Sequence, residues 1–274
     1  MANSQSIGVL DSGVGGLTVL KELHALLPNE SFIYLGDSGR APYGPRPVEE
    51  IQVYTEEMID LLISKGAKAV VLACNTITVN CLNALQMKYN IPIIGMNFAT
   101  QEVDQASKKR SIAILGTAAT IAAKKHEDAL KEAAPDIRIY PIACYDFCPL
   151  VEAGHIGDEK AAAAIAQYLA PIRGDIDVAL LACTHYPFLT KDIQAFLGDT
   201  ATLIDPSYLT ALDTKNVLEA HELLSEATEK GSISLHFSGD SSLVTPLVKL
   251  ALNKKLPINP VQWKTKVVQK SATE

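Results

Sequence analysis

Short apolar segments alternate with amphipathic segments along most of this 274-residue chain. The apolar segments are rich in β-branched residues and have no polar face, which is typical of strands buried on both faces of a sheet. We place them at residues 7–10, 32–35, 69–73, 91–94, 112–115, 137–142, 178–182, 202–204 and 232–237. Helical patterns separate them at residues 17–27, 48–65, 120–133, 159–169 and 209–226. This order predicts an α/β fold with doubly wound, mostly parallel sheets.

Two pairs of matching segments indicate that the chain contains two similar units. Residues 6–12 (SIGVLDS) resemble residues 111–117 (SIAILGT), and the triplet Leu-Ala-Cys ends at both Cys74 and Cys183. The first pair is offset by 105 residues, from 6 to 111, and the second by 109, from 74 to 183. Such a repeat predicts two α/β domains related by pseudo-twofold symmetry, one formed by residues 1–98 plus 207–274 and the other by residues 99–206. We expect the active site in the cleft between them, at the carboxyl ends of the strands.

Charge and cysteine usage exclude several classes of protein. The net charge of −7, without a basic cluster, argues against nucleic acid as the main partner. No apolar run reaches the roughly 18 residues that a membrane span needs, and the start of the chain shows no secretion signal. We therefore expect a cytoplasmic protein without membrane association, whose five cysteines are reduced thiols. Cys81, Cys144 and Cys148 are interpreted as small buried hydrophobes, and no metal is expected because Cys144 and Cys148 lack a second pair of zinc ligands.

The two remaining cysteines occupy equivalent places in the repeat. Cys74 and Cys183 each end a predicted strand and precede a predicted helix, at residues 75–84 and 187–196. A helix N-terminus favours the thiolate, which is the form of cysteine that acts as a base or nucleophile. His185 follows the second cysteine closely, so we expect it to assist Cys183 in acid–base chemistry. The alternative for either cysteine alone is a buried strand end without chemistry.

Two glycine-containing loops are candidate anion sites. Residues 11–16 (DSGVGG) follow a strand and open a helix, so their backbone N–H groups could hold an anion. The segment matches neither the dinucleotide fingerprint nor the phosphate-loop pattern, and Asp11 would repel phosphate, so a carboxylate is the better candidate. Residues 42–45 (PYGP) form a rigid turn that either binds a carboxylate through its amides or is only structural. Glu152 has no local feature that distinguishes it from a surface acid.

Taken together, these segments resemble glutamate racemases, within the aspartate/glutamate racemase family. The resemblance runs from about residue 6 to about residue 205 and rests on residues 11–16, 34–37, 42–44, 73–76, 116–120, 151–152 and 182–187. Aspartate racemases share the paired cysteines but not this whole set of neighbours. The resemblance implies cofactor-independent interconversion of L- and D-glutamate, which supplies D-glutamate for peptidoglycan and thus for the cell wall. It also implies a homodimer, the common state in the family.

The resemblance also implies roles for individual residues. Cys74 and Cys183 would be the two bases, with Asp11 assisting Cys74, and Glu152 and His185 assisting Cys183. The residues that would bind the substrate are Asp11, Ser12, Tyr43, Gly44, Asn75, Thr76, Thr117, Thr184 and His185. Inversion at Cα requires one group to remove the proton from one face and another to return a proton to the opposite face. A thiol with a pKa of ~8.5 can supply either state near neutral pH, and hydrogen-bond donors around the substrate carboxylate would stabilise the carbanion.

Four places depart from the family pattern. Residues 96–100 (MNFAT) replace a more apolar stretch that usually ends in Pro-Gly, and residues 206–209 are also less typical. Ala182 stands where glycine is frequent, and His126 where tyrosine is frequent. These changes leave the implied catalytic set intact and bear on packing between the units, on oligomer contacts and on regulation.

Alternative functions remain open at this point. One is a racemase for aspartate or another acidic amino acid, since one methylene changes affinity only modestly. Another is a non-catalytic amino-acid-binding protein on the same fold, which we would expect to lack one of the two cysteines. Nucleic-acid binding as a side activity has little support in the acidic composition.

Overall fold

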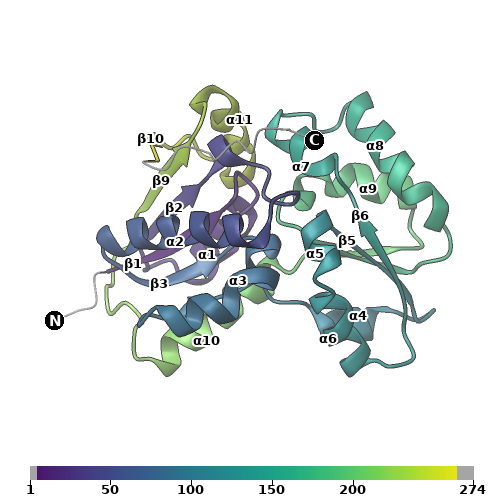
Figure 1. Ribbon diagram of the computed structural model, residues 1–274, viewed down its shortest axis with the longest axis horizontal. Helices are drawn as coiled ribbons and strands as arrows, with labels where there is room; N and C mark the ends of the chain where they lie inside the picture. Colours follow the sequence, from purple (N-terminus) through teal and green to yellow (C-terminus); the bar gives the residue numbers. More distant parts are fainter. Residues whose placement is uncertain (1–4, 264–274) are drawn as a thin grey trace, which may run out of the picture.

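Two parallel β-sheets flanked by helices make up the structure, a computed structural model that describes residues 5–263 (Figure 1). In this part of the chain, the first sheet has six strands in the order β10-β9-β2-β1-β3-β4. They are β1 (Ser6–Asp11), β2 (Phe32–Gly36), β3 (Ala67–Leu72), β4 (Ile93–Ile94), β9 (Ile233–Ser238) and β10 (Ile258–Val261). The second sheet has the order β6-β5-β7-β8, from β5 (Ser111–Gly116), β6 (Arg138–Ala143), β7 (Val178–Ala182) and β8 (Thr202–Ile204). The paired strands run parallel in both sheets, which confirms the predicted α/β class.

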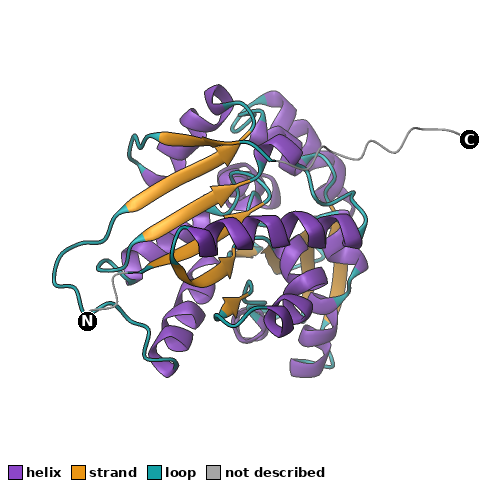
Figure 2. Ribbon diagram, turned by 60° about the vertical axis from the view of Figure 1, so that its left-hand side comes forward, coloured by secondary structure: helices purple, strands orange, loops and turns teal. Residues whose placement is uncertain are grey.

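Helices cover both faces of the first sheet (Figure 2). One face packs against α1 (Leu17–Leu26), α10 (Ser207–Ala220) and α11 (Ser241–Leu252), in a core that includes Val9 and Phe237. The other face packs against α2 (Val48–Ser64) and α3 (Asn75–Lys88), in a core that includes Leu10 and Leu35. Both faces of β1 are therefore buried, which explains why its sequence is apolar without alternation.

The second sheet is covered in the same way. One face packs against α7 (Phe147–Glu152), α8 (Glu159–Leu169) and α9 (Thr190–Leu197), and these helices lie together in Figure 1. The other face packs against α4 (Thr100–Ala106) and α6 (Lys125–Ala133). The apolar core under α7, α8 and α9 is continuous with the core between α1 and the first sheet. The two units thus share buried apolar contacts beside the place where their strands end.

The predicted strands all appear, with ends shifted by at most two residues, whereas several helices differ. The predicted helix at 120–133 is wrong as one element: α5 (Ala118–Ala122) and α6 are separated at Lys124, which has a left-handed backbone with φ of 56°. The predicted helix at 209–226 begins at Ser207 and ends at Ala220, just before Glu222, which also has positive φ. The predicted helix after Cys183 is a 3₁₀ segment (Tyr186–Leu189) followed by α9. Three helices and one strand were not anticipated, namely α4, α7, α11 and β10.

The two sheets are built from three successive stretches of the chain. The chain leaves the first sheet after β4, builds β5 to β8, and returns through α10 to add β9 and β10 to the first sheet. The boundaries at residues 98 and 206 stay a prediction, and residues 1–4 and 264–274 of the first domain lie outside the described part.

Among residues 5–263, no helix combines the length and the apolar character that crossing a bilayer requires.

Candidate active site

A cavity of about 250 Å³ lies between the two units, at the carboxyl ends of their central strands. Both predicted thiols, Cys74 and Cys183, line it from opposite units. The structure brings all the other predicted site residues to this cavity, with Asp11 directly behind its wall. The lining residues are Ser12, Ser38, Ala41, Pro42, Tyr43, Gly44, Cys74, Asn75, Thr76, Thr117, Cys148, Pro149, Glu152, Cys183, Thr184 and His185.

Cys74 is held as a neutral thiol. It follows β3 as the residue before α3, and its Sγ lies 3.8 Å from the Ser12 hydroxyl oxygen. Burial, helped by the nearby negative charge of Asp11, raises the pKa of Cys74 well above that of a free thiol. The helix N-terminus favours the thiolate, as expected, but at Cys74 the cost of desolvation exceeds that effect.

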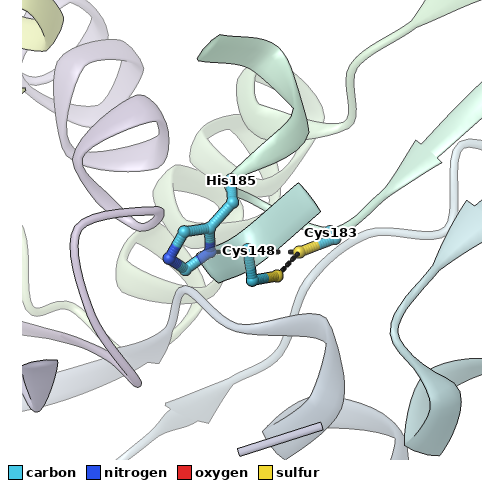
Figure 3. A group of neighbouring side chains, drawn as sticks. All are labelled: Cys148, Cys183 and His185. Carbon is cyan, nitrogen blue, oxygen red and sulfur yellow. Dashed lines mark hydrogen bonds between the residues drawn. The ribbon is translucent and has the colours of Figure 1, made fainter. Parts of the chain in front are cut away.

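Cys183 is held as a thiolate. Its Sγ lies 3.4 Å from the Sγ of Cys148 and 3.9 Å from Nδ1 of His185 (Figure 3). Burial opposes ionisation of Cys183, but the hydrogen bonds from Cys148 and His185 and the charge of His185 outweigh it and lower the pKa of Cys183. The two thiols of the cavity thus differ in protonation state, although their strands are equivalent.

A chain of charged groups fixes the orientation of His185. Its Nε2 lies 2.7 Å from Oε1 of Glu152, which comes from α7. Burial disfavours the charged imidazole, yet the contacts with Cys183 and Glu152 raise the pKa of His185 well above its usual value. His185 therefore carries a positive charge between the thiolate and the carboxylate.

The first unit also holds Glu152. The amide of Val14 donates to Oε1 at 2.8 Å, and the hydroxyl of Ser38 donates to Oε2 at 3.0 Å. Burial opposes ionisation of this carboxyl group, and the hydrogen bonds from His185, Val14 and Ser38 overcome it and lower the pKa of Glu152. Glu152 is thus a link between the units as well as a partner of His185.

Asp11 lies at the end of β1, fully buried, and joins the units in the same way. Its Oδ1 accepts a hydrogen bond from the Gly13 amide at 2.7 Å, and its Oδ2 accepts one from the Thr184 hydroxyl at 3.2 Å. Burial raises the pKa of Asp11 to about 6, against the opposing effect of His185. Asp11 influences Cys74 through its charge, since within residues 5–263 its carboxylate accepts hydrogen bonds from Gly13 and Thr184.

The glycine loop holds the protein's own carboxylates. The amides of Gly13 and Val14 are engaged by Asp11 and Glu152, so these two groups are unavailable to a substrate. The amides of this loop thus hold anions, but these are carboxylates of the chain itself and not the ligand carboxylate expected from the sequence. Glycine is required here for close approach: a Cβ on Gly13 would lie 1.8 Å from Oε1 of Glu152, and one on Gly15 would lie 2.4 Å from Nδ1 of His185.

The opposite side of the cavity offers neutral hydrogen-bond donors. The hydroxyl oxygens of Thr76 and Thr117 lie 2.8 Å apart, and that of Thr120 lies 3.0 Å from Thr117. The buried Nδ2 of Asn75 has no hydrogen-bond partner among the described residues, although such groups are nearly always paired. Tyr43 donates its hydroxyl proton to Asp37, and the carbonyl groups of Pro42 and Tyr43 accept from Arg46, so the amide of Gly44 is the group that this loop offers for binding. Within residues 5–263, no lysine or arginine lines this cavity.

Cys148 is a site residue that the sequence interpretation missed. It is buried, as expected, but it contacts Cys183 instead of being a passive core residue. It lies four residues before Glu152 on α7, so both side chains lie on the same face of the helix. Because the family resemblance already implied Glu152 at the site, this spacing was the signal that could have indicated Cys148 as well.

Comparison with known proteins agrees with this architecture. The model of the Asp/Glu/Hydantoin racemase family matches residues 7–211. The glutamate racemase of Oceanobacillus iheyensis is 37% identical over 248 residues, which cover 89% of this chain and 90% of that protein. The solved glutamate racemase isoform of Bacillus anthracis has a TM-score of 0.88 at 34% identity and covers 96% of this chain and 100% of its own. The glutamate racemase of Francisella tularensis, solved with D-glutamate, has a TM-score of 0.84 at 28% identity, with 95% and 98% covered.

The structure places two thiols, from matching strand ends, in one cavity between two α/β units. This site and these relatives together define an enzyme of the amino-acid racemase class. The chain belongs to the Asp/Glu/Hydantoin racemase family, and within it to the glutamate racemases. The resemblance inferred from the sequence motifs is therefore confirmed.

Proposed function

We propose that this enzyme interconverts L- and D-glutamate by direct proton transfer at Cα, with Cys74 and Cys183 as the two bases and without a cofactor. One observation carries the proposal: the two thiols line one cavity from opposite units and are held in opposite protonation states. Racemisation by two bases needs this combination, because one group must accept a proton while the other donates one. A non-catalytic binding protein would have no need for it.

The remaining lining groups fit the other requirement of the reaction. The Cα proton of an amino acid is weakly acidic, so donors around the carboxylate must stabilise the charge that develops when it leaves. We assign this role to the free amide of Asn75, the hydroxyls of Thr76 and Thr117, and the backbone at Gly44. We assign the ammonium group to Ser12 and Thr184, which line the cavity, and to the negative charge of Asp11, which lies behind Thr184.

The relatives favour glutamate over aspartate as the substrate, because the chain resembles glutamate racemases over most of its length. From the family resemblance we further propose that the D-glutamate formed supplies peptidoglycan synthesis. The homodimer and the cytoplasmic location stay predictions.

Incubation of the purified protein with L- or D-glutamate in D2O, without any added cofactor, tests the proposal. We expect inversion from either enantiomer, accompanied by deuterium at Cα of the product, because the proton that arrives comes from a thiol in exchange with solvent. Proton NMR and chiral chromatography measure the two events in one sample. Inversion without deuterium in the product would contradict transfer by two bases, and faster turnover of aspartate than of glutamate would contradict the substrate.

His126 offers a further prediction about substrate binding. Its Nε2 lies 3.1 Å from Oδ1 of Asn75, and burial lowers its pKa to about 4, so the neutral ring donates to the amide oxygen. This bond leaves Nδ2 of Asn75 free for the substrate. His126→Phe removes the donor and keeps an aromatic ring packed at a tilt against Phe98, where the centroids now lie 4.2 Å apart. We expect KM for glutamate to rise about 10-fold, as for the loss of one buried hydrogen bond.

His126→Tyr is the matched control, since tyrosine returns a donor at the end of the ring. We expect it to recover most of the affinity lost in His126→Phe, with kcat similar in both variants. Steady-state kinetics in both directions measures this. Equal KM values for His126→Phe and the unmodified protein would show that the orientation of Asn75 does not depend on His126.

A further inference from the structure

Three potential metal ligands converge at one side of the cavity. Sγ of Cys148, Sγ of Cys183 and Nδ1 of His185 all lie within 4.8 Å of one another, on residues that are 8%, 5% and 3% exposed (Figure 3). They come from α7 and from the turn after β7, so the group exists only through tertiary packing. From the sequence, Cys148 was considered as a zinc ligand only together with Cys144, and that pair lacked further ligands. In the structure Cys148 lies beside Cys183, which in turn contacts His185.

The spacing fits a tetrahedral ion. With Zn–S near 2.3 Å and Zn–N near 2.0 Å, two thiolates of a tetrahedral site are about 3.8 Å apart, and a thiolate and an imidazole nitrogen about 3.6 Å apart. The corresponding separations here are 3.4 Å between the sulfurs and 3.9 Å between Sγ of Cys183 and Nδ1 of His185. Small side-chain rotations therefore suffice to place all three atoms around one ion.

The second layer of contacts fits as well. A histidine that binds a metal through one nitrogen usually donates its other N–H to a carboxylate, which fixes the ring and strengthens the ligand. His185 has this arrangement: Nδ1 faces the two sulfurs, while Nε2 lies 2.7 Å from Glu152. Glu152 is in turn held by Val14 and Ser38. The ring is thus already oriented for a metal on its Nδ1 side, and binding of the ion releases the Nδ1 proton of His185 and the thiol proton of Cys148 to solvent.

We propose that Cys148, Cys183 and His185 form a binding site for a thiophilic divalent cation such as Zn²⁺, and that the bound ion switches the enzyme off. All three residues line the cavity, so the fourth coordination position opens toward the space where the substrate binds. A thiolate that donates an electron pair to the metal is a much weaker base toward the Cα proton. The binding site stands on geometry alone, whereas the inhibition rests on the proposed role of Cys183 as a base.

Metal binding is tested first, without reference to turnover. We expect the reduced, full-length protein to bind one Co²⁺ per chain with the absorption bands of tetrahedral cobalt and of thiolate-to-cobalt charge transfer, and Zn²⁺ to displace it stoichiometrically. Cys148→Ser retains the size of the side chain but supplies a poor ligand. It should halve the charge-transfer intensity and weaken Zn²⁺ binding by on the order of 100-fold or more. Circular dichroism verifies that the variant is folded.

Cys81→Ser is the matched control, because it removes another buried thiol, on α3, that is not part of the group. It should bind Co²⁺ and Zn²⁺ as the unmodified protein does. Absence of binding by the folded protein, or unchanged binding in Cys148→Ser, would overturn the site. Because these readouts are spectroscopic, a failure here leaves the proposed racemisation untouched.

Inhibition is measured on the same proteins. Stoichiometric Zn²⁺ should abolish racemisation of glutamate, and a chelator should restore it. Each variant is compared with its own rate in the absence of metal, and Cys148→Ser should need on the order of 100-fold more Zn²⁺ for the same fractional loss. A protein that binds Zn²⁺ through this group and still racemises at its full rate would overturn the switch. A protein that binds Zn²⁺ but never racemises glutamate would contradict only the proposed function.

Discussion

Replacing either Cys74 or Cys183 by serine is expected to lower the rate of glutamate racemisation by about 10³-fold, the range typical of removing a positioned acid or base. A serine hydroxyl is a far weaker acid than a thiol, so it neither accepts nor donates a proton at a useful rate near neutral pH. The effect should appear in kcat in both directions, because each direction of the reaction needs both groups. Cys81→Ser, a buried thiol away from the cavity, should leave the rate unchanged.

The two variants should differ in what they retain. Cys74→Ser keeps the Cys183 thiolate and its His185 partner, so it can still remove the proton from one enantiomer and return a solvent deuteron to the same face. In D2O it should therefore exchange Cα–H of one enantiomer with retention of configuration. Cys183→Ser keeps only Cys74, whose burial favours the neutral thiol, and should exchange far more slowly. Full racemisation by either single variant would exclude the two-thiol mechanism.

Much of this arrangement could be predicted because the central strands carry a strong signal. Four site residues end or follow the central strands β1, β3, β5 and β7, namely Asp11, Cys74, Thr117 and Cys183. These strands are continuous apolar runs, which is typical of a parallel sheet. Since the carboxyl ends of parallel strands meet at one edge, finding the strands also places these residues. The internal repeat then pairs the edges of the two sheets, and with them the two thiols.

The strand pattern says less about three other residues of the cavity, of which only Glu152 was implied, and that through the family resemblance. Ser38, Cys148 and Glu152 lie on short helical segments whose positions depend on packing between the units. The protonation states could not be predicted either: both cysteines precede helical turns, yet burial dominates at Cys74, while Cys148 and His185 reverse its effect at Cys183. Sequence equivalence thus located the two thiols but did not reveal the difference between them.

Glu152 carries the second large effect, and it combines chemistry with stability. It accepts hydrogen bonds from the His185 ring, the Val14 amide and the Ser38 hydroxyl, and so binds the second unit to the first. Glu152→Ala leaves a buried imidazolium and a buried amide without their partner, and removes the charge that keeps His185 protonated beside Cys183. We expect racemisation to fall by about 10³-fold and the free energy of unfolding to fall by about 3 kcal/mol.

Glu152→Gln separates the two contributions. The amide oxygen of glutamine can still accept from Val14 and His185, so stability should be largely retained, while the loss of the negative charge should lower kcat by about 10²-fold. Asp136→Ala is the control for removing any carboxylate from an ion pair, because Asp136 binds Arg110 on the surface, with 68% of its side chain exposed. Surface pairs contribute little, so this variant should unfold and racemise as the unmodified protein does. Urea denaturation and kcat/KM measure both effects, and equal unfolding midpoints for Glu152→Ala and Asp136→Ala would show that Glu152 does not hold the two units together.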